Sequence, residues 1–241
     1  MPTARFYEES SLGLVIYDGN PDQKITFTSA PYDWLEASVF YTNIQGKPYP
    51  GFEYQDYKDK GFNFKIRLKE EGVLPSLAIG MNDIAGTGLY SSEYVVSSYG
   101  IGNVDLHLGV GWGNLDGYKD FSNPFTKISD YFDERPEGLV GLGGEIDYDR
   151  YFSGKTSSAF FGMTYVLNDK FIAKLERDTT LTPGFIGFDA PKKKSSIGLD
   201  FNPSENFTLG IAFERGNAFT FRFSYKQSKN TNPKTTYKKS D

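Results

Sequence analysis

The sequence predicts an all-β fold, specifically a closed antiparallel transmembrane β-barrel, from three observations. Thirteen short runs along the 241 residues carry apolar side chains at every second position, and only a strand sorts alternate residues onto two faces. The apolar face is rich in Phe and Tyr, whereas the opposite face carries Gly, Ser, Thr and charges. No run approaches the roughly 20 apolar residues of a transmembrane helix, which a barrel does not need. A soluble sandwich or lipocalin-like barrel is the alternative.

Each expected strand is justified by its own alternation. In the clearest run, Phe64 and Ile66 face away from Lys65 and Arg67. A helix would mix these residues on one surface, whereas a strand separates them. The thirteen runs are, in chain order, 12–16, 24–28, 35–42, 61–69, 76–82, 93–98, 104–112, 145–149, 161–167, 171–176, 196–201, 207–214 and 219–225.

The connections between the runs predict the orientation and the strand number. Long outer loops are expected at 43–60, 114–141 and 178–194, with short turns at the other end of the barrel. A closed antiparallel barrel needs an even number of strands, and thirteen is odd. We therefore expect 14 strands, with one more crossing between Asn114 and Gly141. The alternative is 12, in which one run extends a neighbouring hairpin.

The domain organisation is expected to be simple. Residues 1–226 form one barrel domain, with 1–10 as an N-terminal lead-in, and 227–241 form a polar, Lys-rich tail or linker. Residues 1–5 show neither a charged region followed by an apolar stretch nor a small-residue cleavage site. With a barrel composition, we interpret this as a chain without its leader, located in the Gram-negative outer membrane.

Composition excludes several classes of protein. The absence of Cys excludes disulfide scaffolds, zinc fingers and thiol catalysis, and a single His leaves little for a transition-metal site. The net charge of −5 argues against a nucleic-acid binder. We therefore expect no metal, no cofactor and no nucleic-acid partner.

Charged residues on the polar face of the expected strands are the candidates for a lumenal binding site. Charges in a dry interior are costly, so these must be solvated, paired or bound to a ligand. Carboxylates and amides also bind sugar hydroxyls, which suits such a face to a polysaccharide path. The candidate lumenal residues are Lys65, Arg67, Glu93, Asp105, His107, Glu145, Asp147, Asp149, Lys174 and Arg222.

Two groups among these candidates call for separate interpretation. Glu145, Asp147 and Asp149 form an acidic ladder on one expected strand, and we expect them to pair with lumenal Lys and Arg side chains. Calcium is an alternative, but it needs six to eight oxygens and the sequence has no EF-type loop.

His107 lies two residues from Asp105, yet nothing supplies a nucleophile motif. We expect a hydrogen-bonding His and no enzyme activity.

Several sequence motifs carry a resemblance to a known family. The most specific stretch is Gly86–Tyr94, followed by Leu108–Asn114. The other motifs, in the same order along the chain as in the family, are Met1–Phe6, Pro31–Ser38, Tyr57–Lys60, Asp149–Gly154 and Phe213–Asn217. The chain resembles one barrel half of the YjbH/GfcD family of exopolysaccharide and capsule outer-membrane proteins.

The resemblance implies an outer-membrane barrel that acts in exopolysaccharide or capsule production or export, and we expect it to be non-enzymatic. It implies contact with outer-membrane lipid and lipopolysaccharide, with an exopolysaccharide, and with other exopolysaccharide-assembly proteins. Two alternatives stay open: a structural scaffold for periplasmic partners, and a barrel enzyme that acts on lipid or glycan.

Overall fold

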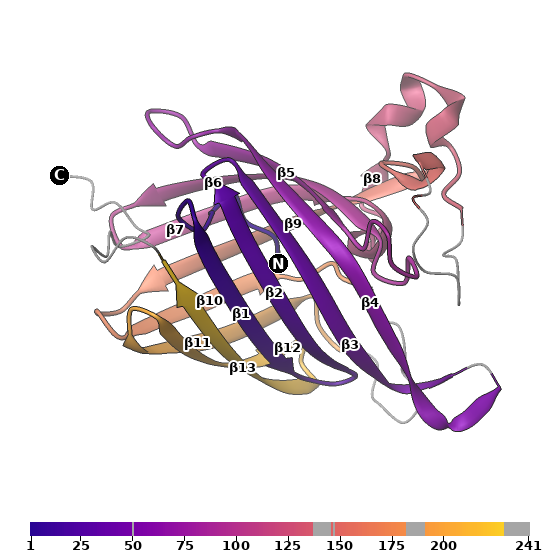
Figure 1. The fold of residues 1–241 in the computed structure, drawn as a ribbon. Helices are drawn as coiled ribbons and strands as arrows, with labels where there is room; N and C mark the ends of the chain where they lie inside the picture. Colours follow the sequence, from indigo (N-terminus) through magenta and orange to yellow (C-terminus); the bar gives the residue numbers. More distant parts are fainter. Residues whose placement is uncertain (50, 137–145, 147, 182–190, 229–241) are drawn as a thin grey trace.

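A computed structural model describes residues 1–49, 51–136, 146, 148–181 and 191–228 of the chain. Within these residues the fold is a single antiparallel sheet closed into a barrel, because β9 pairs with both β7 and β10 (Figure 1). The wall strands are β1 (Ser11–Asp18), β2 (Asp22–Tyr32), β3 (Leu35–Tyr49), β4 (Phe52–Lys69), β5 (Ser76–Asn82), β6 (Ser92–Ile101), β7 (Val104–Gly111), β9 (Thr156–Val166), β10 (Phe171–Arg177), β11 (Ser195–Ser204), β12 (Phe207–Glu214) and β13 (Ala218–Gln227).

The closed antiparallel architecture and the even strand number are confirmed, and the number is 12, the alternative expectation, in place of 14. The expected strand at 145–149 is wrong at its described end, where Tyr148–Arg150 forms a short 3-10 helix, and Glu145 and Asp147 lie outside the described residues. Among the described residues between β7 and β9, the only strand is β8 (Phe121–Ser122), which pairs with the edge of β9 outside the barrel wall. The barrel wall passes directly from β7 to β9. The number of wall strands is therefore even, and the long and short connections alternate regularly.

Side chains on the wall alternate as the sequence predicts. Outward-facing Phe27, Phe62 and Phe221 are 45%, 47% and 46% exposed, as expected for residues that face lipid. Inward positions carry small or polar groups, and the Thr28 and Ser38 hydroxyls lie 3.0 Å apart across β2 and β3. Among the described residues, no helix is long and apolar enough to cross a membrane.

The two ends of the barrel differ, and we call them the long-loop end and the short-turn end. The connections β5–β6, β7–β9 and β10–β11 lie at the long-loop end. The expected loop at 43–60 is instead mostly paired strand, with Ile44 opposite Tyr57 and Tyr49 opposite Phe52. Buried Ile44 and Tyr57 pack with Phe40 and Tyr90, and this apolar contact holds the hairpin together. The β3–β4 hairpin consequently projects beyond the barrel (Figure 1).

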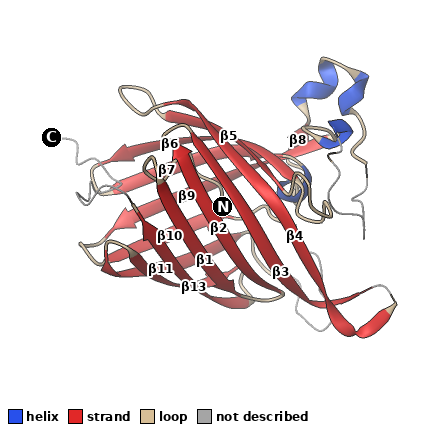
Figure 2. Ribbon diagram, viewed as in Figure 1, coloured by secondary structure: helices blue, strands red, loops and turns tan. Residues whose placement is uncertain are grey.

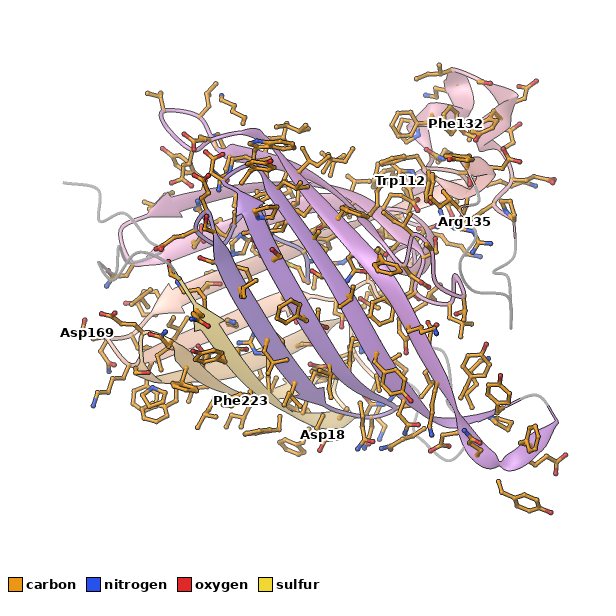
Figure 3. All side chains as sticks on the ribbon, in the orientation of Figure 1. Asp18, Trp112, Phe132, Arg135, Asp169 and Phe223 are labelled. Carbon is orange, nitrogen blue, oxygen red and sulfur yellow. The ribbon has the colours of Figure 1, made fainter. Side chains whose placement is uncertain are left out.

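The connection from β7 to β9 folds into a small unit that we call the outer cap, comprising the described residues of 113–155. It contains β8 and the short 3-10 helices Gly113–Leu115, Pro124–Lys127, Asp130–Phe132 and Tyr148–Arg150 (Figure 2). Trp112 is 3% exposed and donates from Nε1 to Asn123 Oδ1 at 2.9 Å. Its ring contacts Phe125 and Phe152 at centroid distances of 5.5 and 5.2 Å. Figure 3 shows Trp112, Phe132 and Arg135 together at this end, with Asp169 at the other.

Candidate functional site in the barrel lumen

Residues 1–10 run inside the barrel and occupy one side of its lumen. The Ala4 N–H donates to Ser98 Oγ on β6 at 2.9 Å, and the Tyr7 N–H donates to Glu36 Oε1 on β3 at 2.5 Å. Ala4 is buried in an apolar cluster with wall residues that include Tyr94 and Phe160. In Figure 1 the N-terminus accordingly lies within the outline of the barrel. We call residues 1–10 the lumenal segment.

Arg5 is the main polar anchor of the lumenal segment. Its Nε and Nη2 donate to the two carboxylate oxygens of Asp105 on β7, at 2.8 and 2.5 Å. Its Nη1 lies 2.5 Å from Glu71 Oε2, and its carbonyl accepts a bond from Lys65 Nζ at 2.5 Å. Lys65 Nζ also lies 2.7 Å from Glu36 Oε2. Charge-assisted bonds of this kind are stronger than neutral ones, so the segment is held at several points of the wall.

The remaining contacts of the lumenal segment are aromatic. Lys65 Nζ and the Arg67 guanidinium lie over the Phe6 ring, at 4.3 and 4.6 Å from its centroid. Such cation–π contacts stabilise the ring between two charges. Arg67 also pairs with Glu70 at 2.9 Å.

His107 and Asp105 both face the lumen, as predicted. His107 Nδ1 lies 2.8 Å from Ser98 Oγ, and its Nε2 lies 3.5 Å from Thr164 Oγ1 and 3.7 Å from Asp105 Oδ2. The Ser98 hydroxyl is buried and accepts from Ala4. The lumenal segment therefore covers the Ser98 hydroxyl, which lies within hydrogen-bond distance of His107.

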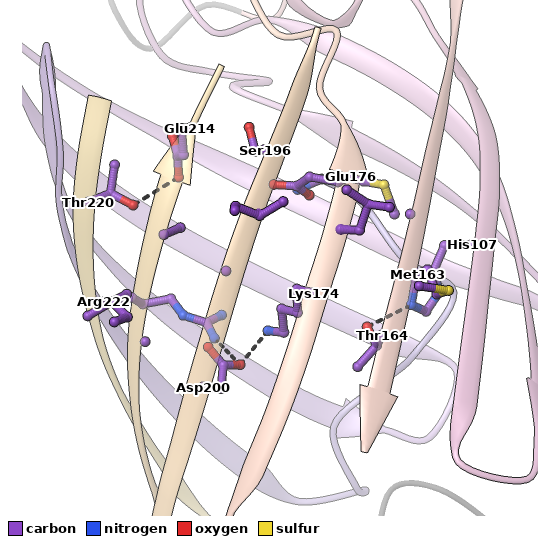
Figure 4. Close-up of a pocket in the computed structure, with 18 of the residues that line it drawn as sticks. His107, Met163, Thr164, Lys174, Glu176, Ser196, Asp200, Glu214, Thr220 and Arg222 are labelled. Carbon is purple, nitrogen blue, oxygen red and sulfur yellow. Dashed lines mark hydrogen bonds and ion pairs between the residues drawn. The ribbon is translucent and has the colours of Figure 1, made fainter. Parts of the chain in front are cut away.

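A cavity of about 260 Å³ lies beside the lumenal segment, whose Met1 and Thr3 contribute to its lining. Its wall comes mainly from β9 to β13, with His107 contributed by β7, and Asp200 lies between Lys174 and Arg222 (Figure 4). Asp200 Oδ2 is 2.5 Å from Lys174 Nζ and 2.6 Å from Arg222 Nη2. One carboxylate between two cations leaves net positive charge at this point of the cavity. We call Lys174, Asp200 and Arg222 the charged triad.

Two glutamates line the same cavity nearer the long-loop end. Glu214 accepts from Tyr17 Oη at 2.9 Å and from Thr220 Oγ1 at 3.1 Å. Glu176 Oε2 lies 3.0 Å from the amino group of Met1. The cavity thus presents carboxylates, ammonium and guanidinium groups in one space, which is the donor and acceptor set that recognises sugar hydroxyls and acidic groups.

The structure brings six of the predicted site residues into the lumen: Lys65, Arg67, Asp105, His107, Lys174 and Arg222. They fall into two groups, those that hold the lumenal segment and those that line the cavity. Glu145 and Asp147 lie outside the described residues. Asp149 is in a 3-10 helix of the outer cap, so the expected acidic ladder on a strand is wrong for this residue.

Glu93 was predicted to face the lumen, and this is wrong. It lies opposite Met81 in the β5–β6 pair, on the outward face, and the outer cap buries it completely. Arg135 Nη1 and Nη2 donate to its two oxygens at 2.8 and 2.9 Å, and the Phe152 N–H donates at 2.8 Å. The carboxylate therefore fastens the outer cap to the wall.

Sequence reasoning missed several residues that complete the site. Glu36, Asp200 and Glu214 lie on polar strand faces, so the same alternation that selected Lys65 and Arg222 could have found them. Arg5 has no such signal, because the lumenal segment shows no periodicity. Only the fold reveals that it reaches Asp105.

A closed antiparallel barrel with an apolar outer face and a charged lumen defines a porin-like transmembrane β-barrel. The family model described as exopolysaccharide biosynthesis protein YbjH matches residues 1–241. The chain belongs to this YjbH family, which confirms the resemblance seen in its motifs.

A curated relative supports the same assignment. The chain is 34% identical over 227 residues to a protein of Escherichia coli (strain K12) described as uncharacterized lipoprotein YjbH, and the match covers 91% of this chain and 32% of that protein. The chain therefore spans about a third of the length of the curated relative.

A solved porin structure shows the same fold. The KdgM porin in complex with disordered oligogalacturonate superposes with a TM-score of 0.50 and 7% identity, over 91% of this chain and 99% of that one. The NanC porin superposes with a TM-score of 0.42 and 11% identity, over 91% and 99%.

Proposed function

We propose that this chain is an outer-membrane β-barrel that takes part in production or export of an exopolysaccharide by binding glycan in its lumen, without catalysing a reaction. The observation that carries the proposal is the cavity beside the charged triad, inside a closed barrel of the YjbH family. Exopolysaccharides offer hydroxyl groups and often carboxylates, and the triad and its neighbouring glutamates supply complementary partners.

The proposed location is supported by the outer surface of the barrel. Aromatic and aliphatic side chains such as Phe64, Ile66 and Leu175 are 40%, 38% and 39% exposed on the wall. Exposing such residues to water over a whole wall is unfavourable, whereas lipid accommodates them. Contacts with lipopolysaccharide and with other exopolysaccharide-assembly proteins are part of this proposal.

A scaffolding role is the second candidate, and the lumenal segment favours it. The lumenal segment fills part of the lumen, so the barrel is expected to conduct ions poorly. Such a barrel is better suited to hold periplasmic partner proteins than to pass a polymer. An enzyme is disfavoured because the Ser98 hydroxyl beside His107 is buried under Ala4. We propose that His107 orders the wall through its hydrogen bonds.

Purified protein in a planar bilayer tests the proposal. Oligogalacturonate is a suitable acidic glycan probe, and a neutral dextran of similar length is its uncharged counterpart. We expect the acidic probe to block the ionic current reversibly. In the double variant Lys174→Gln/Arg222→Gln, the probe concentration needed for the same block should rise about tenfold or more. A loss of one charge-assisted bond of about 1.5–3 kcal/mol corresponds to such a change.

The matched control is Lys170→Gln, which removes an exposed positive charge from the short β9–β10 turn. It should leave the block unchanged. A barrel that responds to neither glycan would contradict glycan binding and leave the scaffolding role as the better explanation.

A further inference from the structure

The end of the β3–β4 hairpin stands clear of the neighbouring strands. β2 pairs with β3 only as far as Ile44, and β5 pairs with β4 only from Phe64 onwards. The β3–β4 pair nevertheless continues to Tyr49 opposite Phe52. Figure 1 shows this part projecting past the end of the barrel wall. We call the described residues of 45–58 the hairpin arm.

Three aromatic rings form a row along the hairpin arm. The Tyr49 ring lies in the middle, with its centroid 6.3 Å from that of Phe52 and 5.4 Å from that of Tyr57. Exposure falls along the row, from 62% at Phe52 to 39% at Tyr49 and 2% at Tyr57. Tyr57 belongs to the buried cluster with Phe40 and Ile44. The row is therefore fixed to the barrel at one end and open at the other, so a ligand finds the rings already in place.

Polar and charged side chains flank these rings in the sequence of the hairpin arm. Lys47 Nζ lies over the Tyr57 ring, 5.8 Å from its centroid. Glu53 and Gln55 are exposed, and Asp56 is half-buried. Lipid-facing surfaces and the cores of protein interfaces are depleted of charged residues. The hairpin arm therefore suits neither lipid nor a protein partner as well as it suits a sugar.

Aromatic rings beside polar groups are a combination that binds sugars. The C–H faces of a pyranose ring pack on the negative face of an aromatic ring. The sugar hydroxyls exchange hydrogen bonds with carboxylates, amides and ammonium groups. The charges of the hairpin arm balance, with Lys47 and Lys58 against Glu53 and Asp56. An uncharged glycan therefore fits it better than the acidic glycan expected at the charged triad.

We propose that Tyr49 and Phe52 form a second glycan site, outside the lumen, which stacks on the pyranose rings of an uncharged stretch of polysaccharide. Tyr57 holds Tyr49 in position, and Glu53 and Gln55 bind sugar hydroxyls. The proposal rests on the proposed function only for the class of ligand, because the hairpin arm contributes no residue to the lumenal cavity. A chain bound here lies at the long-loop end of the barrel.

Saturation-transfer NMR on purified protein tests the site, in lauryldimethylamine oxide because sugar-based detergents would compete. The probes are cellohexaose and maltohexaose, two uncharged glucose chains with different linkages. We expect the wild type to bind at least one, with saturation transferred to the pyranose ring protons. Tyr49→Ala/Phe52→Ala should weaken the binding about tenfold, because two stacking contacts are lost. Tyr49→Phe keeps the ring and should bind nearly as the wild type does.

The matched control is Tyr32→Ala/Trp34→Ala at the short-turn end. These two rings are also exposed and stacked, with centroids 5.5 Å apart, but they lie far from the hairpin arm in the barrel. Their loss should leave sugar binding unchanged. The change in gel mobility on boiling, which folded barrels show, checks that each variant is folded. If the double arm variant does not fold, the single variant Phe52→Ala should still weaken binding severalfold.

Three results would overturn the proposal. The first is a wild type that binds neither hexasaccharide. The second is equal binding by the wild type and Tyr49→Ala/Phe52→Ala, or a loss seen instead in Lys174→Gln/Arg222→Gln, which would place the sugar in the lumen. The third is a wild-type dimer that the arm substitutions dissociate, because a second copy would then cover the rings. The current block by oligogalacturonate should persist in the arm variants, so failure here leaves the proposed function intact.

Discussion

Arg5 and Asp105 are one hundred positions apart in the sequence and are joined by two hydrogen bonds, from Nε to Oδ2 at 2.8 Å and from Nη2 to Oδ1 at 2.5 Å. The pair crosses from the lumenal segment to strand β7. Asp105 is 1% exposed, so its charge has exchanged water for the Arg5 guanidinium. This contact is the main polar anchor of the lumenal segment inside the barrel.

The first prediction is that Arg5→Ala releases the lumenal segment and opens the barrel. Removing one partner of a buried ion pair costs about 3–5 kcal/mol, because Asp105 then stays buried without the two bonds that anchor the lumenal segment. We expect the single-channel conductance in a planar bilayer to rise several-fold. Arg5→Ala/Asp105→Asn should stay open yet recover part of the lost thermal stability, because no unpaired charge remains.

The control for this prediction is Arg177→Ala. Arg177 also binds an aspartate through two bonds, to Asp120 at 2.8 Å each, but at the long-loop end and outside the lumen. Its loss should leave the conductance unchanged. Equal conductance in wild type and Arg5→Ala would show that the lumenal segment does not limit passage.

The second prediction concerns the charged triad. Asp200→Asn removes the carboxylate between Lys174 and Arg222, so the local charge in the cavity becomes more positive by one. A charged ring in a narrow passage selects ions of opposite sign. We expect the reversal potential in a KCl gradient to shift towards anion selectivity, and acidic oligosaccharide to bind more tightly. Asp169→Asn, at the short-turn end (Figure 3), should cause neither change.

The third prediction concerns the outer cap. Arg135→Ala removes both bonds from the guanidinium to Glu93. The fully buried carboxylate then keeps the bond from the Phe152 N–H. We expect a local cost of about 3–5 kcal/mol. Limited proteolysis with proteinase K should then cut the outer cap at least tenfold faster, while the barrel stays resistant. Lys127→Ala changes an exposed cation of the same cap and should not alter the rate.

The barrel wall could be predicted from sequence because alternation is a local property. Phe64 and Lys65 are adjacent in the chain and point to lipid and to lumen, and their residue types already record that difference. The same rule predicted Lys174 and Arg222 as lumenal residues correctly. It failed for Glu93, because an outward position covered by the outer cap can carry a charge as well as an inward one.

The contacts between distant segments could not be predicted in this way. The lumenal segment has no repeating pattern, and Arg5 acquires its role only through the position of Asp105 in the closed sheet. The strand expected at 145–149 is wrong at its described end for a related reason, since alternating acids are compatible with a strand and also with a 3-10 turn such as Tyr148–Arg150. Alternation over so few residues does not separate the two.

The last prediction concerns the packing that supports the lumenal segment. Gly109 on β7 faces inward, and a Cβ there would lie 2.2 Å from Phe160 Cζ and 2.7 Å from the Val95 carbonyl oxygen. Phe160 is 1% exposed in the cluster with Ala4 and Tyr94, so it has little room to move. Overpacking of this kind costs about 1–3 kcal/mol.

We therefore expect Gly109→Ala to lower the urea midpoint of unfolding, followed by tryptophan fluorescence in detergent micelles. Gly72→Ala is the matched control, because a Cβ at Gly72 meets no atom within 4 Å. If the two variants unfold at the same urea concentration, Phe160 moves aside at no cost. The close fit between Gly109 and Phe160 would then contribute nothing to holding Ala4, and the Arg5–Asp105 contact would hold the lumenal segment through its polar bonds alone.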